Sequence, residues 1–306
     1  MTCGSARRIA AISGVAALVL STSPARAQSS GLESLIEQYS GTTIKGYIQP
    51  LADVLVANLS LAYTTSAAPM SKFSFGLELV SMTAALDDKL RLYTATTPPG
   101  FQPTSYTAPT IFGGQAPTVN HSSIPGLSYR GSDGLVDAEY FPSAAPQLRI
   151  GGFFGTEVVF RYASSTMVPL LDEEDFPALT LMGFGVQHSL SRYVKLPVDV
   201  SVSASLNSLK FGDIVDLSAN AFGLNFGSTL GPLGVSFGVL SEGGTMNLSY
   251  TSTDPNASGT VNVDLDVERT MRFRGGASLS LGFLRVFGDA AFGDVKSYAA
   301  GLRLGF

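Results

Sequence analysis

The last ten residues of the chain alternate between apolar and small or polar side chains, and this alternation constrains the fold more than any other feature. One parity holds Tyr298, Ala300, Leu302, Leu304 and Phe306, and the other holds Ser297, Ala299, Gly301, Arg303 and Gly305. A repeat of two residues places these two sets on opposite faces of a β-strand. The chain also ends on an aromatic residue in the apolar register, which a strand of a soluble sandwich need not do.

The same alternation recurs upstream, and the charged residues keep to the face opposite the apolar one. Phe273 and Leu279, for example, share one face of a segment in which Arg272 and Arg274 share the other. The charged residues on such non-apolar faces are Glu78, Arg149, Glu157, Arg161, Asp199, Arg272, Arg274, Asp289 and Arg303. A soluble sandwich also segregates its faces, but its solvent face carries many more lysines and glutamates. We therefore expect these charges to line an enclosed lumen.

Composition narrows the class of protein further. Charged residues make up only 14% of the chain, which is low for a soluble surface. Beyond the N-terminal residues, no segment reaches the about 18 uninterrupted apolar residues of a spanning helix. Only helices and closed barrels satisfy all their backbone groups in lipid. The sequence thus predicts an all-β protein, a transmembrane antiparallel up-and-down β-barrel.

The N-terminal residues have the order of a secretory signal peptide. Arg7 and Arg8 precede an apolar run at 9–20, and Ala25-Arg26-Ala27 is a small-x-small cleavage site. As a helix the run would span about 18 Å, too little for a bilayer core of about 30 Å. We expect cleavage after Ala27, which removes residues 1–27 and with them the single cysteine.

Together these features resemble the Gram-negative outer-membrane β-barrel proteins. The resemblance covers the leader, the alternating strands from about residue 57 and the terminal Phe306. It implies the cell outer membrane as location, with outer-membrane lipid and lipopolysaccharide as surroundings. It also implies an assembly signal, read by the barrel-assembly machinery, in Tyr298, Leu302, Leu304 and Phe306. No motif of a studied family appears, so an uncharacterised family is expected; a helical segment ahead of the strands is loosely similar to the longer fatty-acid transporter barrels.

Counting strands back from the C-terminus predicts about 12 in the barrel domain, 57–306, because bacterial barrels have an even number. The predicted strands lie near 57–66, 71–83, 89–94, 147–153, 156–164, 178–189, 196–206, 213–229, 232–252, 260–283, 285–293 and 296–306. Fourteen would result if Gly243 and Gly244 split one strand into a hairpin. Short links at 154–155, 192–195, 230–231 and 284 mark the periplasmic end, which also holds the C-terminus.

Two segments remain outside this count. Residues 96–146 are rich in proline, which removes ladder donors, so we expect a long outer loop that is either free or folded into the barrel mouth. Residues 28–56 are expected to be helical, over 31–39 and 48–56. Because Leu32, Leu35 and Ile36 are spaced for surface packing, a periplasmic helix is favoured over a plug in the lumen.

Few residues are candidates for chemistry. His121 and Ser123 have the spacing of a His–Ser pair that activates a hydroxyl, but they lie in the proline-rich segment without a flanking motif, so a chance match is favoured. His188 is interpreted as a strand end. The acidic cluster 172–175 lacks the spacing of a calcium loop and is interpreted as a solvated loop. No metal site, cofactor or enzymatic activity is expected, and the excess of 24 acidic over 19 basic residues argues against nucleic acid.

The leading functional hypothesis is a passive channel or transporter for an unidentified small or apolar solute. Under it the lumen charges screen solutes; equally, they could be paired charges that fill a narrow barrel. Arg272, Arg274 and Arg303 would share one wall with Asp289, so Arg303→Glu should shift ion preference toward cations. A structural or surface-binding barrel is the alternative, and a hydrolase is the least favoured. Because the chain has no Trp, Tyr63, Tyr162 and Tyr298 are expected in the interfacial girdle.

Overall fold

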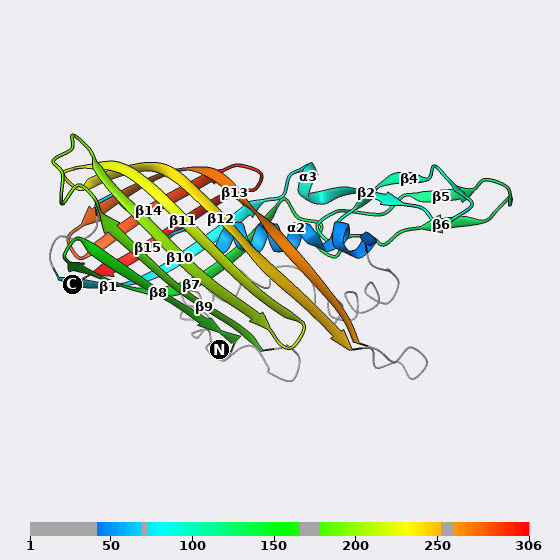
Figure 1. Cartoon of the computed structure of the whole chain (residues 1–306), viewed down its shortest axis with the longest axis horizontal. Coiled ribbons are helices and arrows are strands. Elements are labelled where there is room, and N and C mark those ends of the chain that lie inside the picture. Colours follow the sequence, from blue (N-terminus) through cyan, green and yellow to red (C-terminus); the bar gives the residue numbers. More distant parts are fainter. Residues whose placement is uncertain (1–41, 69–72, 166–177, 252–259, 306) are drawn as a thin grey trace, which may run out of the picture.

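A closed antiparallel barrel dominates the computed structural model, which describes residues 42–68, 73–165, 178–251 and 260–305 (Figure 1). In these ranges ten strands form the barrel, in the order β1-β15-β14-β13-β12-β11-β10-β9-β8-β7, and β1 closes it by pairing with both β15 and β7. The barrel strands are β1 (Ser74–Ala85), β7 (Tyr140–Phe153), β8 (Thr156–Ser164), β9 (Leu179–Ser189), β10 (Asp199–Phe211), β11 (Val215–Leu230), β12 (Leu233–Thr251), β13 (Thr260–Leu281), β14 (Leu284–Phe292) and β15 (Lys296–Gly305).

The predicted alternation of faces is present in the barrel wall. In β15, Tyr298, Leu302 and Leu304 are exposed on the outside, whereas Ser297 and Arg303 are buried on the inside. Phe306 lies outside the described residues. The exposed apolar side chains form a belt around the outside of the barrel, which includes Leu77, Leu79, Phe160, Tyr162, Phe184, Leu206, Phe222, Leu224, Phe237 and Phe273. This belt is the outer surface that the sequence pattern predicts.

Two predicted strands are wrong, which leaves ten rather than 12. Residues 57–66 instead complete helix α2 (Thr42–Leu59) and continue as irregular chain, in which Ala62 has a positive φ of 63° and so interrupts any extended strand. Residues 89–94 fall in a short helix, α3 (Asp88–Arg91), and in β2 (Leu92–Thr96), which pairs with β4 (Ser105–Pro109) outside the barrel. Apolar and polar residues alternate in both segments. Neither segment can join the barrel, however, because the ten strands already form a closed ladder without a free edge.

The 14-strand alternative is also wrong. The pairing of β12 with β13 continues past Gly243 and shifts register between Glu242 and Gly244, so the two glycines accompany a β-bulge and not a hairpin. β7 begins at Tyr140, earlier than predicted, and includes Pro142 and Pro146. These prolines pair only with β1, because the ladder with β8 begins at Gln147, so their missing N–H groups cost no ladder bond on that side.

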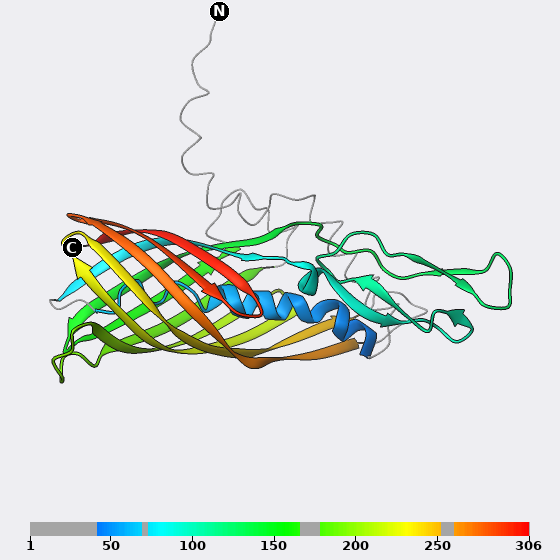
Figure 2. The same cartoon turned by 90° about the horizontal axis from the view of Figure 1, so that it is seen from above.

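The residues between β1 and β7 form a projection beyond one end of the barrel, as Figures 1 and 2 show. We call residues 86–139 the extension. It contains α3, the β2–β4 pair and a small sheet of β3 (Phe101–Gln102), β5 (Thr118–His121) and β6 (Ser128–Arg130). The proline-rich segment is therefore a folded arm, not a structureless loop. We call this end of the barrel the loop end, and the opposite end, with tight connections at 154–155, 231–232 and 282–283, the turn end.

Helix α2 runs along the inside of the barrel (Figures 1 and 2). Its first turns meet the extension, since the backbone N–H of Ile111 donates to the Tyr47 carbonyl at 3.0 Å and the Tyr47 hydroxyl donates to the Asp133 carbonyl at 2.9 Å. The predicted helix at 48–56 is confirmed, but its favoured placement as a periplasmic helix is wrong, because it lies in the lumen. The predicted helix at 31–39 lies outside the described residues. Within the described ranges, no helix combines the length and the apolar character needed to cross a membrane.

Candidate functional site

The lumen is filled by the chain itself, and the residues that hold this filling form the candidate site. We call α2 together with residues 60–68 the plug. In the half of the barrel nearer the loop end, α2 packs against inward-facing apolar side chains. They are Ala84, Leu181, Leu217, Ala219, Met246, Leu248, Val263 and Leu265. Ile48, Val54 and Val56 are fully buried on different sides of the helix, as expected of a helix enclosed on all faces.

Nearer the turn end, buried arginines of the wall bind the end of α2. The last carbonyls of any helix lack partners within the helix. Arg272 Nη2 donates to the Ala57 carbonyl at 2.8 Å, and Arg161 Nη1 donates to the Leu59 carbonyl at 3.1 Å. The two guanidiniums thus satisfy carbonyls that would otherwise be buried without a partner, and their positive charge faces the negative end of the helix dipole.

The same kind of contact holds the irregular part of the plug. Arg161 Nη2 donates to the Leu61 carbonyl at 2.8 Å, and Arg149 Nη1 donates to the Tyr63 carbonyl at 2.9 Å. Arg274 Nη2 donates to the Thr64 carbonyl. The side-chain amides of Gln147 and Gln187 donate to the carbonyls of Ala62 and Ser66 at 3.1 and 2.7 Å. Consecutive backbone groups of the plug are therefore bonded to side chains of the barrel wall.

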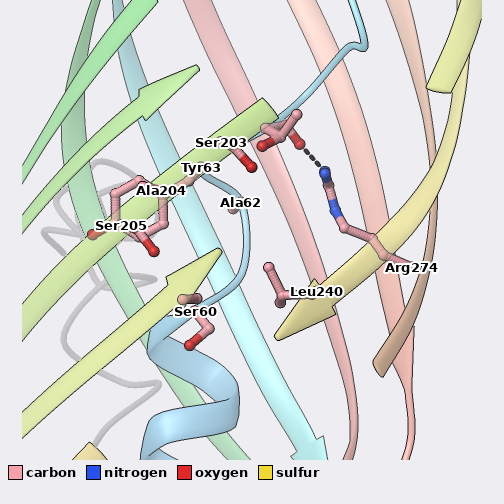
Figure 3. Close-up of a pocket in the computed structure, with 10 residues that line it drawn as sticks. Ser60, Ala62, Tyr63, Ser203, Ala204, Ser205, Leu240 and Arg274 are labelled. Carbon is pink, nitrogen blue, oxygen red and sulfur yellow. Dashed lines mark hydrogen bonds between the residues drawn. The ribbon is translucent and has the colours of Figure 1, made fainter. Parts of the chain in front are cut away.

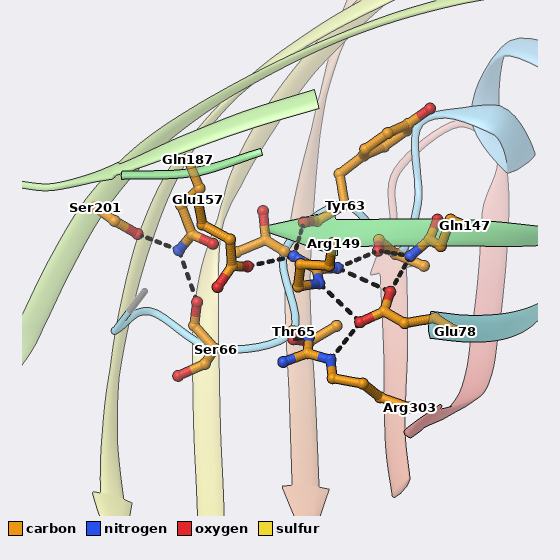
Figure 4. Close-up of polar contacts among 12 residues, drawn as sticks. Tyr63, Thr65, Ser66, Glu78, Gln147, Arg149, Glu157, Gln187, Ser201 and Arg303 are labelled. Atoms are coloured by element: carbon orange, nitrogen blue, oxygen red, sulfur yellow. Dashed lines mark hydrogen bonds and ion pairs between the residues drawn. The ribbon is translucent and has the colours of Figure 1, made fainter. Parts of the chain in front are cut away.

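Buried carboxylates accompany these arginines (Figure 4). Glu78 lies between Arg149, whose Nε donates to it at 2.7 Å, and Arg303, which also donates to it. Glu157 accepts from Arg149. Further round the barrel Glu242 pairs with Arg272 at 2.7 Å and Asp289 with Arg274 at 2.8 Å. The expected wall of Arg272, Arg274, Arg303 and Asp289 is thus made of ion pairs, which matches the interpretation of charges that fill the lumen.

Tyr63 anchors the plug to strands β9 and β10. Its hydroxyl donates to Asn207 Oδ1, and the Arg161 guanidinium lies over its ring at 4.3 Å from the centroid. Gly183 and Gly185 of β9 leave the space for this side chain, because a Cβ atom at either position would overlap it. Tyr63 is buried, so its predicted place in the interfacial girdle is wrong; Tyr162 and Tyr298 do face outward.

Little space remains beside the plug. A cavity of about 10 Å³ lies between residues 60–64 of the plug and strands β10 and β11, with Arg274 and Leu240 on its other side (Figure 3). A cavity of this size is at the lower limit for one water molecule. The arrangement of plug and wall leaves no room here for a solute.

Of the predicted lumen residues, Glu78, Arg149, Glu157, Arg161, Arg272, Arg274, Asp289 and Arg303 are buried in this network. Asp199 is not part of this network, because it is the first residue of β10 at the turn end and is partly exposed. Sequence reasoning missed Glu242, Gln147 and Gln187, and it gave the plug that they hold only as the less favoured alternative. One signal could have found the plug, since 50–59 carries only Asp53 and Asn58 as polar residues and offers no solvent face.

The two histidines that the sequence singled out, His121 and His188, do not form catalytic sites in the structure. His121 Nδ1 accepts from the backbone N–H groups of Ser123 and Ile124, both at 3.1 Å, and does not bind the Ser123 hydroxyl. His188 bonds Thr156 and Tyr193 at 2.8 and 3.1 Å at the turn end. The acidic cluster 172–175 lies outside the described residues. The part of the chain that the structure describes holds no group of three or more His, Cys, Asp or Glu placed to bind a metal ion.

Comparisons with known proteins identify relatives by sequence and by fold. The model of a family of unknown function (DUF6588) matches residues 6–306. No curated protein matches the chain. The solved structures that it resembles are outer-membrane barrels, at low similarity. OmpT of Vibrio cholerae is 10% identical with a TM-score of 0.27, covering 78% of this chain and 100% of its own.

Two further barrels match over a comparable length. Ail of Yersinia pestis, solved with a heparin analogue, is 8% identical with a TM-score of 0.21, over 77% of this chain and 99% of its own. The toluene transporter TbuX of Ralstonia pickettii is 9% identical with a TM-score of 0.25, over 81% of this chain and 92% of its own. TM-scores this low carry no inference about function.

Proposed function

The chain belongs to this family of unknown function, DUF6588, and for it we propose a closed outer-membrane barrel that presents the extension at the cell surface as a binding arm. The observation that carries the proposal is the filled lumen. A plug bonded through consecutive carbonyls to Arg149, Arg161, Arg272 and Arg274 leaves the extension as the part of the molecule available to partners.

The apolar belt supports a membrane location. A soluble protein rarely exposes a contiguous apolar patch of more than a few hundred Å². Here outward side chains such as Leu77, Phe160 and Phe237 are exposed all around a barrel whose ladder is closed. The N-terminal leader pattern supports export, and a closed barrel in lipid then supports the outer membrane, where lipopolysaccharide and the assembly machinery would be its contacts.

The orientation follows from the lengths of the connections. Bacterial barrels have short periplasmic turns and longer external loops. The turn end has tight connections and the last strand finishes there, while the extension leaves from the loop end. These lengths support the proposal that the extension lies outside the cell.

The tip of the extension has the chemistry of a contact surface. The loop between β5 and β6 exposes Ile124 and Leu127, by 52% and 43%. In water these side chains gain nothing from this position, whereas contact with an apolar surface would bury them at roughly 25 cal/mol per Å². The proposed partner is thus a surface with apolar character.

Cells displaying the chain provide the test. Retention of these cells on octyl-coated beads should fall several-fold when Ile124 and Leu127 are both changed to Asp. The matched control changes Thr118 and Asn120 to Asp, which adds the same charge at exposed polar positions of the same sheet. Equal loss in both variants, or no loss in the first, would remove support for a binding arm.

The expected passive channel finds no support in the plugged arrangement, because a solute could pass only after α2 and residues 60–68 had left the lumen. We propose conduction only for a barrel without its plug. The hydrolase hypothesis likewise finds no support, since His121 accepts two backbone N–H groups in place of a serine hydroxyl.

A further inference from the structure

At the turn end, an open pocket of about 210 Å³ lies at the rim of the barrel, and we call it the vestibule. Arg285 and Arg303 contribute polar groups to its wall, together with Ser280. Phe75 and Phe283 contribute apolar groups and are also exposed at the rim of the barrel. The vestibule thus lies where the inside of the barrel meets the edge of the apolar belt.

Two arginines face each other across neighbouring strands in this wall. Arg285 of β14 and Arg303 of β15 are direct partners in the strand register, and both lie on the inward parity. Side chains at directly opposed positions have Cβ atoms roughly 5 Å apart, and like charges there destabilise a sheet. A pair of this kind calls for a compensating anion.

The protein pairs Arg303 directly with such an anion, but it does not pair Arg285 directly with one. Arg303 donates to Glu78 and to Thr65 Oγ1, the latter at 2.6 Å. Arg285 Nε donates to the hydroxyl of Ser280 at 2.9 Å, which carries no charge. Among the described residues, no carboxylate forms an ion pair with Arg285. Its guanidinium therefore lies at the vestibule with donors left over.

The two nearest acids, Glu157 and Glu78, act on the charge of Arg285 only from a distance, because other arginines bind them directly. Glu78 already accepts from both Arg149 and Arg303, and Glu157 accepts from Arg149. Asp199 starts β10 and is not part of the vestibule wall. This end of the lumen consequently has more guanidiniums than carboxylates, and the surplus is at Arg285.

We propose that the vestibule binds a phosphate group, with Arg285 as its main ligand and Ser280 beside it. A guanidinium matches phosphate oxygens in a bidentate geometry. The pocket is many times larger than the about 10–15 Å³ that one water molecule requires. Its apolar side is formed by Phe75 and Phe283, so a phosphate attached to a larger apolar body fits both walls. A phospholipid headgroup and a free phosphate share this chemistry.

Two measurements on the purified, folded protein in an uncharged detergent distinguish the sources. Isothermal titration with inorganic phosphate reports free phosphate, and native mass spectrometry with phosphatidylglycerol reports the headgroup, with diacylglycerol of the same acyl chains as the phosphate-free control. Binding of either phosphate-bearing probe, without binding of diacylglycerol, supports the proposal. Binding of neither overturns it.

Arg285→Gln is the diagnostic variant and Arg192→Gln is its matched control. Arg192 is a cation at the same end, set against the Phe154 ring and outside the vestibule. Arg285→Gln should weaken binding by about tenfold or more, as expected for losing a charged hydrogen bond, and Arg192→Gln by less than about twofold. An equal effect of both variants, or none from Arg285→Gln, would overturn the site.

Stability gives a second readout that a purely structural arginine would not produce. Without phosphate, the Arg285→Gln barrel should resist heat at least as well as the wild type, because the opposed like charges are gone. Added phosphate should raise the heat resistance of the wild type only. A variant that is equally destabilised with and without phosphate would show that Arg285 serves the fold alone.

Discussion

At the scale of single residues, the lumen is organised by donors and acceptors. Arg161 is fully buried. Its guanidinium donates to the carbonyls of Leu59 and Leu61 and to the Gln147 side chain, and it forms no direct ion pair with a carboxylate among the described residues. A buried carbonyl without a partner costs about 1–3 kcal/mol. Arg161 therefore stabilises the plug chiefly by donating hydrogen bonds to its carbonyls.

Replacing Arg161 tests this role. Arg161→Met keeps much of the side-chain volume but removes the donors, so it should lower the free energy of unfolding by about 2–5 kcal/mol. The temperature at which the unboiled protein loses its shifted gel mobility reports the change. Arg192→Met, at an exposed turn, is the control and should leave that temperature within a few degrees; an unchanged Arg161→Met protein would contradict the role.

The fit of Tyr63 against β9 yields a second residue-scale prediction. Gly185→Ala should destabilise the barrel because the new Cβ overlaps the Tyr63 ring. In a Tyr63→Ala background the same change should cost much less, with a coupling of about 1–3 kcal/mol in a double-mutant cycle. Gly275→Ala, in β13, where no atom lies within 4 Å and φ is not positive, serves as a glycine control that cannot couple to Tyr63. Additive effects of Gly185→Ala and Tyr63→Ala would mean that the ring does not occupy this space.

At the scale of elements, the sequence predicted those features whose pattern lies within a single element. The ten barrel strands were predicted because apolar and polar residues alternate within each strand, as in Tyr298 to Leu304. The strand expected at 57–66 was wrong because Leu59, Leu61 and Tyr63 also alternate, although they alternate in a plug. Whether a segment joins a wall or fills a lumen depends on contacts with residues such as Arg161 and Arg272, far away in sequence, and no local pattern contains them.

The base of the extension should behave as a separate element. Phe112 is fully buried, packs on Phe141 with ring centroids 5.5 Å apart, and belongs to the core around α2. Phe112→Ala should cost about 3–5 kcal/mol locally. Limited proteolysis should then cut the extension faster while the barrel keeps its gel shift. Ile124→Ala, at the exposed tip, is the control; loss of the barrel itself in Phe112→Ala would show that the two are one cooperative unit.

At the scale of the whole molecule, the path of the chain links the two ends of the barrel. α2 starts beside the extension at the loop end and leads towards the turn end, where β1 begins (Figure 2). Lys45, near the start of the helix, is exposed. A membrane-impermeant maleimide should therefore label Lys45→Cys on intact cells, in a chain with Cys3 replaced by Ser. Thr229→Cys, near the turn end, should be labelled only after lysis, and the reverse pattern would invert the proposed orientation.

Conductance in planar bilayers tests the closed lumen most directly. The wild-type barrel should give no steady current, because α2 and residues 60–68 fill it and are bonded to its wall. A variant without 42–66 should conduct, and in that variant Arg303→Glu should shift the reversal potential toward cations, since Arg303 would then face water. A steady, ohmic current through the wild-type protein would contradict the account.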